Sequence, residues 1–105
     1  MNEEQFKART RQLALEIIQL VESLPRSRTA DVIGRQLLRS GTSIGANYRA
    51  ACRGKSKADV ISKLAIVEEE ADESIYWLEL LIEAKIVELS RVESLLKETN
   101  ESLQW

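Results

Sequence analysis

The sequence contains no histidine and a single cysteine, Cys52. Histidine is the commonest general base near neutral pH and a common metal ligand, and one thiol is too few for the usual structural zinc site. These two absences argue against an enzyme and against a metal centre, and we expect no cofactor. One cysteine also excludes an internal disulfide, which favours a reducing cytoplasm.

Turn-forming residues and long apolar runs are scarce as well. One proline and four glycines among 105 residues favour long helices with short connections. The segment from Met1 to Arg11 is mostly polar and does not resemble a signal peptide. No stretch approaches the roughly 18 consecutive apolar residues that a membrane span requires. We therefore expect one soluble cytoplasmic domain over residues 1–105, with no membrane partner and no small-molecule substrate.

Apolar residues recur every three or four positions through most of the chain, which predicts helices and no strand. Pro25, Gly54 and the segment around Lys85 interrupt this pattern. Thr29 and Ser56 are the predicted N-caps after two of these interruptions, and Gly54 is a predicted left-handed C-cap. Short connections make neighbouring helices antiparallel. The prediction is an all-α, up-down-up-down four-helix bundle with helices near residues 5–24, 29–53, 57–84 and 88–103.

The second predicted helix contains an unusual segment rich in small residues, from Gln36 to Ala51. A glycine inside a helix costs roughly 1 kcal/mol relative to alanine. Gly41 and Gly45, four residues apart, therefore indicate close approach of another helix, in the same chain or in a neighbouring subunit. Ser40 and Asn47 fall on the apolar stripe. Asn47 either sets the register of packing or contacts a ligand or RNA.

Three further side chains are predicted to lie between helices or between subunits. Folding the second and third helices about the turn at residues 54–56 places Arg39 beside Glu70 and its acidic neighbours, which predicts an interhelical ion pair. Tyr76 and Trp77 are adjacent, so their side chains diverge by about 100° around the helix. One of the two rings is expected to face the bundle, and the other a second surface such as a subunit contact.

Charge is strongly segregated along the chain. Residues 26–57 contain eight basic residues and one acid, Asp31, whereas eleven acids and three bases follow Leu64. Two interpretations are open: a basic helix neutralised by an acidic one, or a nucleic-acid interface. The candidate residues of such an interface are Arg26, Arg28, Arg49, Arg53, Lys55 and Lys57.

A resemblance to a known family rests on three runs: QLLRSGTSIGANYR (36–49), SKADVISKL (56–64) and EADESIYWLELLIEA (70–84). They resemble the bacterial four-helix-bundle proteins named for intervening sequences of 23S ribosomal RNA, over about residues 10–100. The resemblance implies a bundle that assembles as a ring-shaped homopentamer. A related protein, the accessory variability determinant of diversity-generating retroelements, is a basic pentamer that binds RNA and a reverse transcriptase. This chain departs from the family pattern at Ala50, where an acid is common, and at Glu69, where a base is common.

Two functions follow from these observations. The first is a non-enzymatic, oligomeric scaffold associated with RNA or a nucleic-acid-processing protein through the basic residues of the second helix and the following turn. The alternative is a structural or protein-interaction module with no affinity for nucleic acid. The two differ in whether the six candidate basic residues converge on one exposed face.

Overall fold

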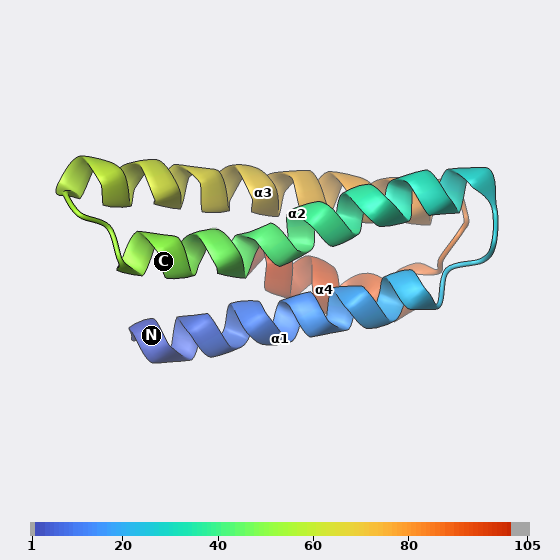
Figure 1. Cartoon of the computed structure of the whole chain (residues 1–105). Coiled ribbons are helices and arrows are strands. Elements are labelled where there is room, and N and C mark those ends of the chain that lie inside the picture. The colour runs from blue at the N-terminus through green and yellow to red at the C-terminus, as the bar shows by residue number, and fades with distance from the viewer. Residues whose placement is uncertain (1, 102–105) are drawn as a thin grey trace.

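The computed structural model describes residues 2–101, which form four α-helices: α1 (Glu3–Glu22), α2 (Arg28–Cys52), α3 (Lys57–Glu83) and α4 (Leu89–Glu101). Each helix packs antiparallel against its neighbour in sequence, and α4 also contacts α1 (Figure 1). No strand occurs within residues 2–101. The predicted all-α, up-down-up-down bundle is confirmed. The predicted end of the fourth helix, at residue 103, lies outside the described residues.

The helices differ in length, and this difference shapes the molecule. Helix α4 has 13 residues and α3 has 27. Figure 1 shows α4 along the half of the bundle nearer the α1–α2 connection. Among the described residues, the opposite end, which holds the α2–α3 turn, is therefore built from α1, α2 and α3. The bundle is elongated, with principal extents of 44 × 23 × 19 Å.

Side-chain caps define the starts of the first three helices. Asn2 and Gln5 form a reciprocal capping box at α1, and the Ser56 hydroxyl accepts the Asp59 N–H at 3.1 Å to begin α3. The prediction for α2 was wrong, because Ser27 rather than Thr29 is the N-cap. The Ser27 hydroxyl accepts the Ala30 N–H at 3.1 Å. Both residue types are good caps, but the cap at Ser27 lets α2 begin one residue earlier.

The prediction for Gly54 was also wrong in its physical reason. Helix α2 ends at Cys52, with Arg53 as its C-cap, and no glycine in the described part of the chain has a positive φ. Gly54 is needed for space instead, since a Cβ atom there would overlap the Val60 side chain. The left-handed position is occupied by Lys85, with φ of 61°, in the α3–α4 connection.

The core follows the predicted stripes closely. Its fully buried large side chains come from the three long helices and include Leu13, Ile17, Leu37, Ile44, Leu78 and Leu81. In α4 the buried residues are Val92, Leu95 and Thr99, whereas Leu89 is exposed. The stripe residues nearest the α2–α3 turn, Val60 and Leu64, are only half-buried. This agrees with the absence of α4 from that end of the bundle.

Helices α1 and α2 approach closely through the glycines of α2. A Cβ atom on Gly41 would overlap Ile17 of α1, and one on Gly45 would lie 3.1 Å from Thr10 Oγ1. Gly34 faces Leu24 in the same way, at 3.1 Å. The sequence left open whether these glycines meet a helix of the same chain or of another subunit. They serve packing within the chain.

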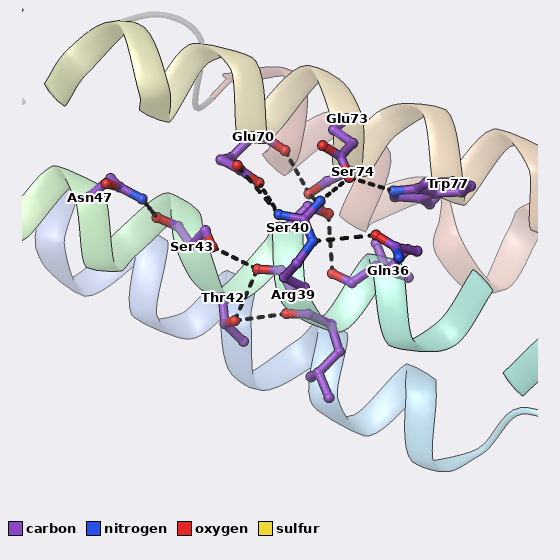
Figure 2. Close-up of polar contacts among 12 residues, drawn as sticks. Gln36, Arg39, Ser40, Thr42, Ser43, Asn47, Glu70, Glu73, Ser74 and Trp77 are labelled. Atoms are coloured by element: carbon purple, nitrogen blue, oxygen red, sulfur yellow. Dashed lines mark hydrogen bonds and ion pairs between the residues drawn. The ribbon is translucent and has the colours of Figure 1, made fainter. Parts of the chain in front are cut away.

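The polar residues on the α2 stripe differ in their roles. The Ser40 hydroxyl is buried and accepts a hydrogen bond from Ser74 Oγ of α3 at 2.8 Å (Figure 2). Asn47 is only half-buried, and its side chain donates to the Ser43 carbonyl of its own helix at 2.9 Å. Interhelical register between α2 and α3 is therefore marked by Ser40 and Ser74, while Asn47 bonds within α2.

We predict that Gly41→Leu lowers the free energy of unfolding by about 2 kcal/mol, because the larger side chain must displace Ile17 in a filled core. Val32→Leu is the matched control, since Val32 lies exposed on the same helix, and should change stability by less than about 0.5 kcal/mol. Urea unfolding followed by circular dichroism measures both. Unchanged stability in Gly41→Leu would show that α1 and α2 are not held at this spacing.

Candidate nucleic-acid interface

The six candidate basic residues lie at two ends of the bundle. Arg26 lies in the α1–α2 connection and Arg28 is the first residue of α2, and both border an open hollow of about 500 Å³. Arg49 and the other three lie at the end of α2, in the α2–α3 turn and at the start of α3. Arg49 is 21 positions beyond Arg28, which corresponds to about 31 Å of helix at 1.5 Å per residue. The six residues therefore form two separate groups and do not converge on one exposed face. A single interface made of all six is thus wrong, and only the group near the α2–α3 turn stays a candidate.

The end that holds the α2–α3 turn is the more basic of the two. We call the exposed side chains of Arg53, Lys55 and Lys57 the basic turn. None of the three forms an ion pair within residues 2–101, although Asp59 accepts the Lys55 backbone N–H at 3.2 Å. The dipole of α2 favours Arg53 at its C-terminus, whereas Lys57 is the first residue of α3, where the dipole of that helix disfavours a cation. The basic turn therefore presents uncompensated positive charge to solvent.

Arg49 lies beside the basic turn but faces an open groove between α1 and α2. The groove encloses about 650 Å³ and is lined by small residues and by basic side chains. Its lining residues are Glu4, Lys7, Ala8, Thr10, Arg11, Ala14, Thr42, Gly45, Ala46 and Arg49. The close α1–α2 packing at Gly45 thus leaves a shallow surface that is accessible from solvent.

Three other basic residues, Lys7, Arg9 and Arg35, form ion pairs with acids. Arg35 pairs with Asp31 at 2.5 Å, and Lys7 pairs with Glu3 at 3.2 Å. The hydrogen bond from Lys7 to Glu3 raises the pKa of its ammonium group. Arg9 binds Glu98 and Glu101 of α4, and these hydrogen bonds raise the pKa of its guanidinium group. These arginines and Lys7 are thus less available to a polyanion than the basic turn.

Arg39 forms the interhelical ion pair that the sequence predicted. Its Nη1 lies 3.2 Å from Glu70 Oε2, and its Nη2 contacts the Glu73 carboxylate (Figure 2). The Glu73 carboxylate also accepts the Trp77 Nε1–H at 3.0 Å. These two donors, the indole first, lower the pKa of Glu73. Arg39 and Glu70 are therefore packing residues rather than candidates for ligand binding.

Tyr76 and Trp77 divide as predicted between the two sides of α3. Trp77 is half-buried and packs against the core, whereas the Tyr76 side chain is 54% exposed. The two rings meet edge to face, with centroids 5.1 Å apart. The outward surface of α3 therefore carries the exposed ring of Tyr76, which contacts the partly buried ring of Trp77.

The sequence interpretation missed two features near the α2–α3 turn: the basic residues that α1 contributes to the groove, and an aromatic pair between α1 and α2. Lys7 and Arg11 belong to α1, far in sequence from residues 26–57, and join Arg49 only because α1 and α2 are antiparallel. Phe6 and Tyr48 meet in the same way, with ring centroids 4.5 Å apart. The spacing of Lys7 and Arg11, four residues apart on one helix face, was the available signal.

Within residues 2–101 no group of three or more Cys, Asp or Glu side chains is arranged to hold a metal ion. Burial, with the neighbouring Cys52, raises the pKa of Tyr48 to about 12. The Tyr48 hydroxyl is therefore protonated at neutral pH and cannot serve as a base.

In the described part of the chain, no helix has the length and apolar character needed to cross a membrane.

These features define the class: an antiparallel four-helix-bundle protein with one strongly basic end. The chain belongs to the 23S rRNA-intervening sequence protein family, whose profile matches residues 3–104. A crystal structure of a protein of unknown function from the S23 ribosomal protein family of Bacteroides thetaiotaomicron is similar, with 39% identity and a TM-score of 0.88. The match covers 94% of this chain and 92% of that one. No curated protein matches the sequence. Neither finding indicates an enzymatic family.

The lowered pKa of Glu73 predicts a pH-dependent stability. Its carboxylate is favoured in the folded state, so its contribution is present above the ordinary pKa of 4.5 and is lost as the pH falls through the lowered value. Glu73→Gln should therefore cost about 0.5–1 kcal/mol at neutral pH, as expected for a partly exposed network. The difference from wild type should vanish in acid.

Urea unfolding over a pH series measures this difference. Trp77→Phe is the matched control, because it keeps a large ring but removes the indole donor to Glu73. It should reduce the pH-dependent part of the stability without abolishing it, since Arg39 still contacts Glu73. A Glu73→Gln cost that is the same at acidic and neutral pH would contradict the ion-pair assignment.

Proposed function

We propose that the protein is a non-enzymatic scaffold that binds the phosphate backbone of RNA through the basic turn and acts as a closed homo-oligomer. The observation that supports RNA binding most strongly is that Arg53, Lys55 and Lys57 lie exposed together at one end of the bundle and form no ion pair within residues 2–101. Cations that are not needed for folding and that cluster at one end are typical of a phosphate-binding surface.

The shape of the basic turn favours backbone contacts over base recognition. Lysine and arginine side chains on a turn reach phosphates without a rigid element that could enter a groove. The exposed aromatic ring of Tyr76 lies on α3 among acidic residues and is unsuited to stacking on a base. We therefore expect structured RNA to be bound through charge, with little dependence on its sequence.

Self-assembly is the second part of the proposal. Large apolar side chains lie exposed on the outer surface of the bundle, including Leu15, Ile18, Ile61 and Tyr76. Exposed apolar groups on more than one helix are typical of a subunit contact. The homopentamer implied by the family resemblance is the assembly that we propose, and a reducing cytoplasm is the compartment. Several basic turns on one oligomer would strengthen RNA binding through multivalency.

A gel-shift titration with a structured RNA over a range of salt concentrations tests RNA binding. The variant Arg53→Gln/Lys55→Gln/Lys57→Gln should bind at least about tenfold more weakly at low salt. The slope of log affinity against log salt concentration should become shallower by about one unit for each phosphate group that the variant no longer binds. Arg49 is left unchanged, because it also lines the α1–α2 groove.

The matched control is Arg26→Gln/Arg28→Gln, which removes exposed arginines at the opposite end of the bundle. Its affinity should stay within about twofold of wild type. Equal losses in the two variants would place the RNA elsewhere or spread it over the whole molecule. No binding by the wild-type protein at low salt would instead favour a protein-interaction module without affinity for nucleic acid.

A further inference from the structure

The α1–α2 groove has the chemistry of a docking surface for an acidic helix. Its lining includes small side chains, among them Ala14 and Ala46, so a partner helix can approach closely. Arg11 and Arg49 line it and form no ion pair within the described residues. Glu4 is the one acidic side chain among the lining residues, and it is bound by Lys7 at 3.6 Å.

An apolar strip continues the groove along α1. Leu15 is four residues beyond Arg11, and Ile18 is four residues beyond Ala14, so both lie on the face of α1 that borders the groove. Their side chains are 46% and 38% exposed. Exposed apolar side chains contribute little to binding the phosphates of RNA, whereas a helix packed on the groove would bury them.

The outer face of α3 has the complementary composition. Side chains at spacings of three and four residues, from Ile61 through Ala65 to Tyr76, point away from the bundle and are all exposed. Ile61 is 57% exposed. The acids on this same face, none of which forms an ion pair within residues 2–101, are Glu68, Glu69, Asp72, Glu79 and Glu83.

We propose that the α1–α2 groove of one subunit binds the outer face of α3 of a second copy of this chain. Ile61 and Tyr76 would pack against the small and apolar side chains of the groove, while Glu68 and Asp72 would meet Arg11 and Arg49. Sixteen residues from Ile61 to Tyr76 span about 23 Å of helix, and the groove with its apolar strip, from Lys7 to Ile18, spans about 17 Å. The two surfaces are therefore comparable in length.

The contact must form between chains. Within residues 2–101, the backbones of α1 and α3 do not approach each other directly, because α2 and α4 each lie between them, and the outer face of α3 is exposed. The two surfaces are also different, so the interface is head-to-tail, and repetition of a head-to-tail interface gives a ring or a filament. The inference rests on the self-assembly proposed above and specifies its interface. It is independent of RNA binding by the basic turn.

Charge reversal with rescue tests the pairing, using light scattering coupled to size-exclusion chromatography in the absence of RNA. The wild-type protein at micromolar concentration should be an oligomer. Arg11→Glu/Arg49→Glu and, separately, Glu68→Arg/Asp72→Arg should each shift the mass toward the 11.9 kDa monomer. Circular dichroism and thermal unfolding check that each variant is folded. Combining all four substitutions in one chain should restore the wild-type mass, because the charges are again complementary.

The control variant Arg26→Glu/Lys97→Glu changes charge by the same amount as Arg11→Glu/Arg49→Glu at exposed positions outside both surfaces, and should keep the wild-type mass. A monomeric wild-type protein would overturn the proposal and leave the groove to a different acidic partner. Folded single-surface variants that keep the wild-type mass would also overturn it, as would a folded four-substitution variant that stays monomeric. RNA binding is read separately from the Arg53, Lys55 and Lys57 variant, so the two proposals can fail independently.

Discussion

The close packing of α1 against α2 is the constraint on which the rest of the structure depends. Gly34, Gly41 and Gly45 present no side chain to α1, and Ile17 occupies the space that a Cβ atom of Gly41 would need. These glycines cost helix propensity, of roughly 1 kcal/mol each, so the packing that they permit must compensate within the fold. The same close approach leaves small residues at the surface between the two helices, and the groove exists for that reason.

Charge is distributed around this packed pair according to what each helix faces. Where α2 meets α3, Arg39 binds Glu70 and Glu73, and the segregated charges of the sequence neutralise each other. The outward sides of the helices are not neutralised in this way. Helix α3 displays acids around exposed apolar residues, and the opposite side of the bundle displays arginines around a strip of small and apolar ones. Local neutralisation and free basic charge thus occur together, on different sides of the same helices.

The sequence predicted the features that depend on local periodicity. Four helices, the Ser56 cap and the Arg39–Glu70 pair follow from apolar spacing and from the short turn that sets the register of α2 and α3. The N-cap of α2 was misplaced because Ser27 and Thr29 are both suitable caps, and only the path of the chain after Pro25 selects Ser27. The groove was missed because it joins Arg11 to Arg49, and apolar spacing alone leaves the register between α1 and α2 open. Periodicity also could not tell that Gly54 is required by the nearby Val60 side chain rather than by its backbone angles.

The central claim is that the basic groove and the acidic face of α3 meet between copies of the chain. Zero-length carbodiimide cross-linking tests it most directly, because it joins a lysine only to a carboxylate in contact with it. An equimolar mixture of natural-abundance and ¹⁵N-labelled protein is cross-linked, and the joined peptides are identified by mass spectrometry. The account predicts cross-links from Lys7 to Glu68, Glu69 or Asp72 that contain one labelled and one unlabelled peptide. Mixed-label cross-links that never join α1 to α3, from a protein that is oligomeric under the same conditions, would contradict it.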